Sequence, residues 1–176
     1  AICQSNYIPW KGYFDYIAGV DEFVLYDDVQ YTKRDWRNRN RIKTPQGLKW
    51  LTIPVTGSQK NNINEVEIAN RYWNKKHWET LRHMYSKADH FDFYEKDISQ
   101  LYKQADFSRL SDINYHFLAG ITKILSIDTP FSWSTDYEPT GDKTERLISI
   151  CKQAQADVYV TGPAAKSYLD VERFRK

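Results

Sequence analysis

The stretch that decides the fold is "AICQSNYIPWKGYFDYIAGVDEFVLYDD", residues 1–28. Its apolar start predicts a strand, residues 9–18 predict a short helix, and "EFVLYDD" (22–28) predicts a second strand bounded by polar residues. A strand–loop–helix–strand unit favours two parallel strands joined by a right-handed crossover. We therefore expect this stretch to begin a parallel sheet.

The middle of the chain predicts a hairpin followed by helices. "RNRIKT" (39–44) and "LKWLTIPVT" (48–56) flank the turn-like tripeptide "PQG", and "INEVEIA" (63–69) predicts another strand. Three helical segments should follow. Apolar residues recur on one face of the first and third, and the second spans roughly 92–104.

The last part of the chain returns to alternating strands and helices. "PFSWSTDY" (130–137) and "DVYVTG" (157–162) predict strands, and Asp142 with Glu145 predicts the start of the helix between them. "PAAKSYLD" predicts a further helix with proline at its first position. We therefore predict a single α/β domain over residues 1–176, with a mainly parallel central sheet, flanking helices, an inserted β-hairpin and a helical middle section.

Composition excludes several classes of protein. Lys and Arg number 25 against 23 Asp and Glu, so no general basic field predicts a nucleic-acid partner. Two cysteines, Cys3 and Cys151, are too few for a disulfide scaffold and favour a reduced, cytoplasmic protein. No apolar run is long enough for a membrane span. The chain does not begin with Met, so we expect some N-terminal residues to be missing from it.

The histidines predict no metal site. The four of them have no metal-ligand spacing, and His77, preceded by two lysines, is expected to be solvated. No cofactor can be named from the sequence.

Ligands of open α/β sheets bind beyond the carboxyl ends of the strands, where three predicted loops converge. The candidate ligand-binding residues of the first loop are Gln4, Asn6, Tyr7, Trp10, Gly12 and Tyr13. The layout resembles the His-x-Gly-His signature of adenylyl transferases. Trp10 and Tyr13 replace the two histidines, however, so ATP activation does not follow. The aromatic share of 15% fits either a ligand-lining cluster or a tyrosine-rich core.

The second loop begins with Asp27 and Asp28. Adjacent carboxylates on a strand point to opposite faces, so the two cannot share one metal without a bulge. Two interpretations are open. Either one aspartate binds backbone amides while the other is solvated, or one is a general base or amine-binding carboxylate.

The arginines of "DWRNRN" are suited to phosphate or carboxylate, because a planar guanidinium forms two parallel hydrogen bonds. We assign Arg39 to binding and interpret Arg37 and Arg41 as a solvated hairpin face. The other candidate binding residues of this loop are Gln30, Lys33, Trp36, Asn38 and Asn40.

The third loop places Gly162 and Lys166 beside a predicted helix start, where free amides favour an anion. It lacks the glycine run of a Walker loop. Cys3, at the end of the first strand, is the one candidate nucleophile at this edge, although small cysteines more often simply pack.

The opening stretch resembles the WbqC-like family of bacterial proteins. The shared pattern comprises Gln4, Pro9, Gly12, Tyr13 and Phe14; then Tyr26, Asp27, Asp28 and Val29; then Trp36, Asn38, Arg39 and Asn40. "LTIPV", "INEVEI" and "VTGPAAKSYLD" also match, so the resemblance covers essentially the whole chain. Ser5 stands where the family usually carries proline. Family members tend to continue for about fifty residues more, so we expect a C-terminal tail to be absent from this chain.

The resemblance implies a role in O-antigen and other surface glycans, whose gene clusters often contain this family. It suggests an amide-forming acyl or aminoacyl transferase acting on a nucleotide-linked amino sugar, with an acyl donor on a possible carrier protein. Asp27 or Asp28 would deprotonate the sugar amine. The alternatives are a nucleotide-dependent, acid-activating enzyme and a non-catalytic module that binds a sugar nucleotide or a partner.

Overall fold

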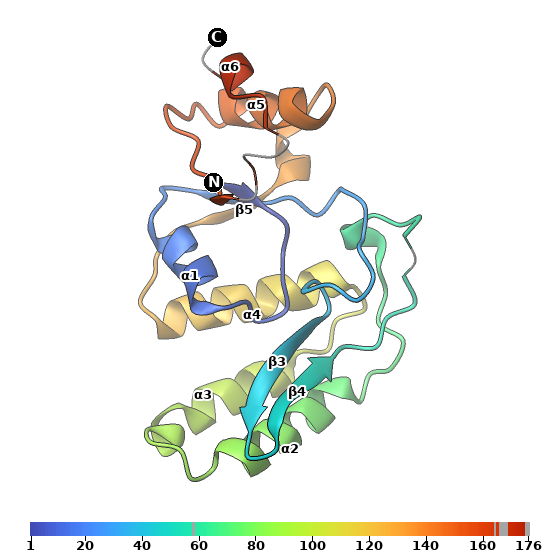
Figure 1. Ribbon diagram of the computed structural model, residues 1–176, viewed down its shortest axis with the longest axis vertical. Coiled ribbons are helices and arrows are strands. Elements are labelled where there is room, and N and C mark those ends of the chain that lie inside the picture. Colours follow the sequence, from blue (N-terminus) through green and yellow to red (C-terminus); the bar gives the residue numbers. More distant parts are fainter. Residues whose placement is uncertain (58, 164, 166–168, 175–176) are drawn as a thin grey trace.

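The computed structural model describes residues 1–176 except 58, 164, 166–168, 175 and 176. Three short strands form a parallel sheet in the order β1 (Ile2–Cys3), β2 (Phe23–Leu25) and β5 (Phe131–Trp133). Both pairings are parallel, with Val24 opposite Ile2 on one side and Ser132 on the other. The mixed α/β class and the parallel sheet predicted from the sequence are confirmed (Figure 1).

Helix α1 (Lys11–Ala18) is the crossover between β1 and β2. Its buried residues, Tyr13, Phe14 and Ile17, lie on one face because they are spaced one and three residues apart. This face packs in one cluster with Phe23 and with Leu118 of helix α4. The opening stretch therefore forms the strand–helix–strand unit that its pattern predicts.

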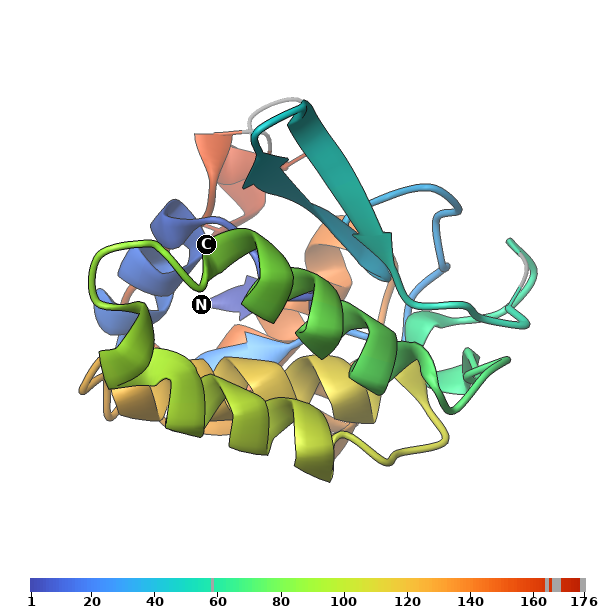
Figure 2. The same ribbon diagram turned by 90° about the horizontal axis from the view of Figure 1, so that it is seen from below.

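The helical middle section consists of α2 (Trp73–Tyr85), α3 (Phe91–Gln104) and α4 (Leu110–Ile124). Figure 1 and Figure 2 show α4 lying between the sheet and the pair α2 and α3. Helices α3 and α4 approach closely at Gly120, where an added Cβ would lie 2.2 Å from Leu101 Cδ2. A larger residue at position 120 would therefore force the Leu101 side chain to move.

The predicted hairpin is present as β3 (Arg39–Thr44) and β4 (Gly47–Thr52), paired antiparallel. Gly47 has φ +107°, a left-handed conformation that favours glycine at the turn. Ile42 and Leu51 point inward and pack in the same cluster as α2 residues. The hairpin lies across the helical layer, on the outside of the molecule (Figure 2).

Two of the predicted strands are replaced wholly or partly by 3₁₀ turns. Residues 63–69 contain the 3₁₀ turn η1 (Ile63–Glu65), which starts with a capping box between Asn62 and Glu65, followed only by isolated bridges. The strand expected over 130–137 ends at Trp133, since Asp136 accepts a hydrogen bond from its N–H and opens the 3₁₀ turn η2 (Ser134–Tyr137).

The strand expected at 157–162 does not form. Helix α5 (Lys143–Gln153) begins after Asp142, as predicted, and α6 (Val171–Phe174) follows later. Between them the Val160 carbonyl accepts a hydrogen bond from the Tyr16 hydroxyl at 2.6 Å instead of joining the sheet. A cavity of about 410 Å³ lies between residues 157–160 and β1.

A polar network lies inside the core, and it corrects the expectation that His77 is solvated. His77 is buried, and its Nε2 lies 3.2 Å from the Thr52 carbonyl, which can only accept. Nδ1 of the neutral ring therefore accepts from Tyr7 Oη at 2.9 Å, and Tyr102 Oη donates to Tyr7 at 2.6 Å. Burial lowers the pKa of His77 from 6.5 to about 4, so the ring is neutral at pH 7.

Candidate functional site

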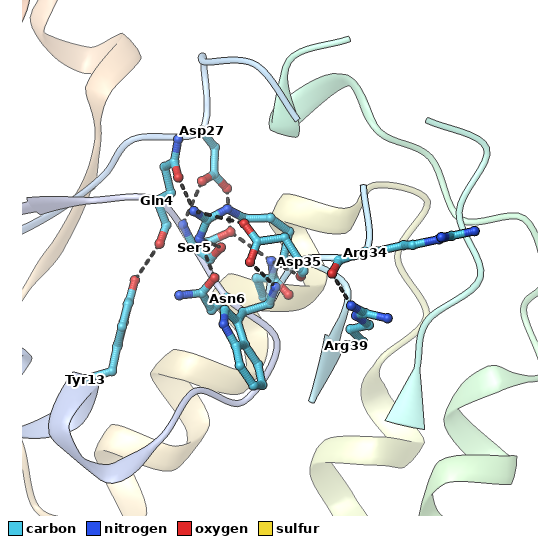
Figure 3. Close-up of polar contacts among 11 residues, drawn as sticks. Gln4, Ser5, Asn6, Tyr13, Asp27, Arg34, Asp35 and Arg39 are labelled. Atoms are coloured by element: carbon cyan, nitrogen blue, oxygen red, sulfur yellow. Dashed lines mark hydrogen bonds and ion pairs between the residues drawn. The ribbon is translucent and has the colours of Figure 1, made fainter. Parts of the chain in front are cut away.

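The loops after β1 and β2 meet at the carboxyl edge of the sheet, and Asp27 joins them (Figure 3). Its carboxylate accepts hydrogen bonds from Ser5 N–H at 2.8 Å, from Ser5 Oγ at 2.6 Å and from Ser111 Oγ at 2.6 Å. Asp27 is 1% exposed, and burial raises its pKa in spite of these three donors. Asp27 thus holds the first loop against the first turn of α4.

The network continues from Asp27 to the chain segment before β3. The side-chain amide of Asn114, on α4, donates to Ser5 Oγ at 2.9 Å and to the Arg37 carbonyl at 3.0 Å. Asn114 Oδ1 is buried and has no partner among the described residues. The two serines, Asp27 and Asn114 together fix the backbone from which the Arg37 side chain projects.

Arg37 lies inside this site, which corrects its interpretation as a solvated hairpin residue. Nη1 donates to Asn6 Oδ1 and, at 3.4 Å, to the Ser5 carbonyl, while Nη2 donates to Gln4 Oε1. Its side chain is only 14% exposed, and the carboxylate that pairs with it, Asp35, lies 3.9 Å away. Arg37 is thus bound mainly by neutral oxygens, an arrangement that can hold an anion.

The first loop is strained at Ile8, whose φ is +43°. A left-handed conformation is a genuine outlier for a β-branched residue, and such strain persists only where the surroundings impose it. Asn40 Nδ2 donates to the Ile8 carbonyl, and Asn38 Nδ2 donates to the Ile53 carbonyl at 2.8 Å. The two asparagines of "RNRN" therefore position the backbone of the loop and the hairpin.

Aromatic side chains border the same loop. Trp10, immediately before α1, is 60% exposed, and its indole lies so close to Gly12 that an added Cβ would be 2.8 Å from Nε1. Tyr13 is buried beneath it and donates from its hydroxyl to the Gln4 carbonyl at 2.8 Å. Trp36 is 37% exposed, and the Tyr7 N–H donates to its carbonyl. Trp10 and Trp36 can contact a ligand, whereas the buried Tyr13 supports the first loop through its hydrogen bond to the Gln4 carbonyl.

Asp28 points away from Asp27, as expected for neighbouring strand residues. It pairs with Arg146 of α5 and accepts a hydrogen bond from Ser134 Oγ, which follows β5. Arg146 Nε is buried without a partner among the described residues. Of the two carboxylates, Asp28 is the more exposed.

Other residues predicted for the site lie outside the hydrogen-bond network around Asp27. Tyr7 is buried in the core network, which differs from its expected contact with a ligand. Burial raises the pKa of the Cys3 thiol, and this makes the thiolate nucleophile scarce at neutral pH. Gln30 bonds the Gln59 carbonyl, and Lys33 is exposed.

In the third loop, Gly162 faces open space and Lys166 lies outside the described residues. Arg39 donates to the Arg34 carbonyl and stacks on Trp50 of the hairpin.

Four residues of the site were missed by sequence reasoning: Ser5, Ser111, Asn114 and Arg146. Three of them lie on helices more than seventy residues from their partners, and no local pattern indicates such a contact. Ser5 was noticed only as a departure from the family pattern, and its hydroxyl supplies a bond to Asp27 that proline could not make.

Within the described part of the chain, no cluster of three or more His, Cys, Asp or Glu side chains could hold a metal ion. In the same residues, no helix is long and apolar enough to cross a bilayer.

Comparison with known proteins gives a family but no activity. The model of the WbqC-like protein family matches residues 4–176. An uncharacterized protein of Mycobacterium tuberculosis, Rv1507c, is 51% identical over 176 residues, which cover 99% of this chain and 76% of that protein. No solved structure matches the chain.

Proposed function

This chain belongs to the WbqC-like protein family, and from that premise we propose that it is a cytoplasmic transferase of surface-glycan synthesis. Its substrate is a nucleotide-linked amino sugar, and its product carries an acyl or aminoacyl group in amide linkage on the sugar nitrogen. The observation that carries the proposal is Arg37, a mostly buried cation held by neutral oxygens at the carboxyl edge of a parallel sheet.

The diphosphate is the natural partner of Arg37. A bidentate guanidinium suits phosphate oxygens, and the amide groups of Gln4 and Asn6 keep its N–H groups directed into the site. Exposed Trp10 and Trp36 supply flat apolar surfaces for a base or a sugar ring. The strain at Ile8 supports the same location, since strained backbone concentrates at functional sites.

Asp28 is the general base of the proposal. Asp27 accepts three hydrogen bonds and is inaccessible, so its role is to position the first loop. In the reaction the sugar amine attacks the acyl carbonyl, its proton passes to Asp28, and the donor leaves as a thiol when the donor is a thioester. The thiol takes up the proton, so that an amide and a free thiol are the products.

A second function is favoured by one observation. Trp10, Gly12 and Tyr13 stand at the start of a helix that directly follows the first strand of a parallel sheet, which is the layout of adenylyl transferases. In that case the nucleotide bound at Arg37 would be ATP, and the protein would activate an acid.

The test is a thermal-shift titration with UDP, ATP, a dTDP-linked 4-amino-4,6-dideoxy sugar and acetyl-CoA. A ligand at 100 times its dissociation constant adds about 2.7 kcal/mol to the free energy of unfolding. We expect the amino-sugar nucleotide to stabilise the wild type, Arg37→Gln to lose this shift, and the exposed control Arg71→Gln to keep it. Stabilisation by ATP alone would support the acid-activating enzyme instead.

Turnover separates catalysis from binding alone. With the amino-sugar nucleotide and acetyl-CoA, mass spectrometry should detect the amide product, and Asp28→Asn should lower kcat by about a hundredfold or more while the thermal shift persists. Binding without product under every acyl donor tried would indicate a non-catalytic module.

A further inference from the structure

Positive charge is concentrated in one short segment of this nearly neutral chain. Residues 33–49 contain seven Lys and Arg and one Asp, whereas the whole chain has 25 Lys and Arg against 23 Asp and Glu. The remainder is therefore net acidic. The segment corresponds to the hairpin and the turn that leads into it.

The cations gather on the outer face of the hairpin. Alternation along β3 directs Arg39, Arg41 and Lys43 outward, while the inward Ile42 packs in the core cluster that includes α2 residues. In the antiparallel register Arg41 lies opposite Trp50, and Lys43 lies opposite Leu48. The outer face of the hairpin is thus a row of cations beside a row of apolar side chains.

The apolar side chains of this face are exposed. Leu48 is 64% exposed and Trp50 is 41% exposed, and the Trp50 ring centroid lies 5.4 Å from that of Trp36. Figure 2 shows the hairpin as the outermost layer, with α2 on its inner side. No described part of the chain covers the outer face.

The guanidinium groups lie on the indoles and not on carboxylates. Arg39 Cζ is 4.1 Å from the Trp50 ring centroid, and Arg41 Cζ is 5.2 Å from Trp50 and 5.6 Å from Trp36. Among the described residues none of the outward cations has an ion-pair partner, and Arg39 Nε is buried without any partner. The stacked guanidiniums keep N–H groups at their edges for anions.

We propose that the outer face of the hairpin is a docking surface for an anionic membrane. Lys and Arg interleaved with Trp and Leu on a flat, exposed face is the combination that binds phosphate headgroups while apolar side chains enter the boundary of the acyl chains. Complementary charge supplies the long-range attraction, and the exposed Leu48 has no use in a purely electrostatic contact. The proposal does not depend on the transferase activity.

Single-stranded nucleic acid is the competing partner, and the geometry is against it. Such proteins stack bases on free aromatic faces. Here the guanidinium of Arg39 already covers Trp50, so a base would have to displace it.

The test is co-sedimentation of the intact chain with vesicles of phosphatidylcholine alone and with about 30% phosphatidylglycerol. We expect binding to the anionic vesicles only, with loss at about 0.5 M NaCl. Arg41→Glu/Lys43→Glu, which reverses two cations of the outer face, should lower the partition coefficient about tenfold or more. The matched control Lys96→Glu/Lys103→Glu, which changes the net charge equally on exposed positions of α3, should change it less than about twofold.

Two further measurements make the result specific to membranes. Leu48→Ser should weaken vesicle binding several-fold with no change in charge, and it provides an independent readout if the charge-reversed variant does not fold. The proposal is overturned by equal binding to the neutral and anionic vesicles, by equal losses in the two double variants, or by oligo(dT) displacing the protein from vesicles.

Discussion

The polar groups around Asp27 and those on the hairpin face behave in opposite ways. Asp27, Ser5 and Ser111 direct their hydrogen bonds at one another inside the protein. Arg41 and Lys43 direct theirs outward and have no ion-pair partner among the described residues. The interior set fixes a geometry, whereas the outer set retains its capacity to bind.

The location of a polar residue therefore decides its role more than its type does. Arg37 shows this most clearly, because a single residue separates it from Arg39 and yet its guanidinium belongs to the interior set, bound by Gln4 and Asn6. Substitutions of the interior set should therefore change the free energy of unfolding. Substitutions of the outer set should mainly change binding and should have little effect on the free energy of unfolding.

The largest effect is expected from Asp27→Ala. Removing the carboxylate leaves three buried donors without an acceptor, and we expect a loss of about 3 kcal/mol in the free energy of unfolding. Asp27→Asn should cost less, since serine hydroxyls can rotate to accept. Urea denaturation measures both, with the exposed Asp106→Ala as the control that should stay within about 0.5 kcal/mol. A loss in the free energy of unfolding no larger than that of Asp106→Ala would mean that the hydrogen bonds of Asp27 do not stabilise the fold.

Lowering the pH should reduce the free energy of unfolding by a similar or smaller amount. The pKa of His77 is about 4 in the folded protein and near 6.5 when unfolded, so the unfolded state binds more protons between these values. The stabilisation is complete above pH 6.5 and is lost as the pH falls toward 4, by up to about 3 kcal/mol.

Urea denaturation midpoints measured across this range should fall for the wild type. The decline with falling pH should be shallower for His77→Gln than for the wild type. For His83→Gln, which alters an exposed histidine, it should equal that of the wild type. An identical pH dependence of stability in all three proteins would mean that the buried His77 does not contribute to the loss of stability in acid.

The smallest effect is expected from Arg41→Gln. The substitution removes an exposed guanidinium that contacts two indoles, and the free energy of unfolding should fall by less than about 1 kcal/mol. Vesicle binding should weaken in the same variant. A loss of stability comparable to that of Asp27→Ala would mean that the outer face is structural, and the comparison would then fail.

The sequence predicted the parts of the fold that depend on local pattern. The opening strand–helix–strand unit, the hairpin at "PQG" and the three central helices have the expected order, because turn residues and apolar spacing determine them. The strand expected at 157–162 failed because pairing depends on a distant edge, and β1 offers only Ile2 and Cys3.

The candidate site was predicted in its location and only partly in its members. The two loops after β1 and β2 do converge, and Gln4, Asn6 and Trp10 lie there. Arg37 was assigned to solvent because strand alternation was applied to a residue that precedes β3. Ser111 and Asn114 could not be found, since only the folded chain brings α4 to the edge.

Helix α4 has a consequence for how the protein is made. Asp27 accepts a hydrogen bond from Ser111, which lies 84 residues further along the chain. Ser5 accepts one from Asn114, 109 residues away. Contacts of such separation form late, because the loop they close is costly until the chain can bury it. During synthesis from the N-terminus, the first loop therefore leaves the ribosome with its donors facing water, and it is completed only when α4 has emerged.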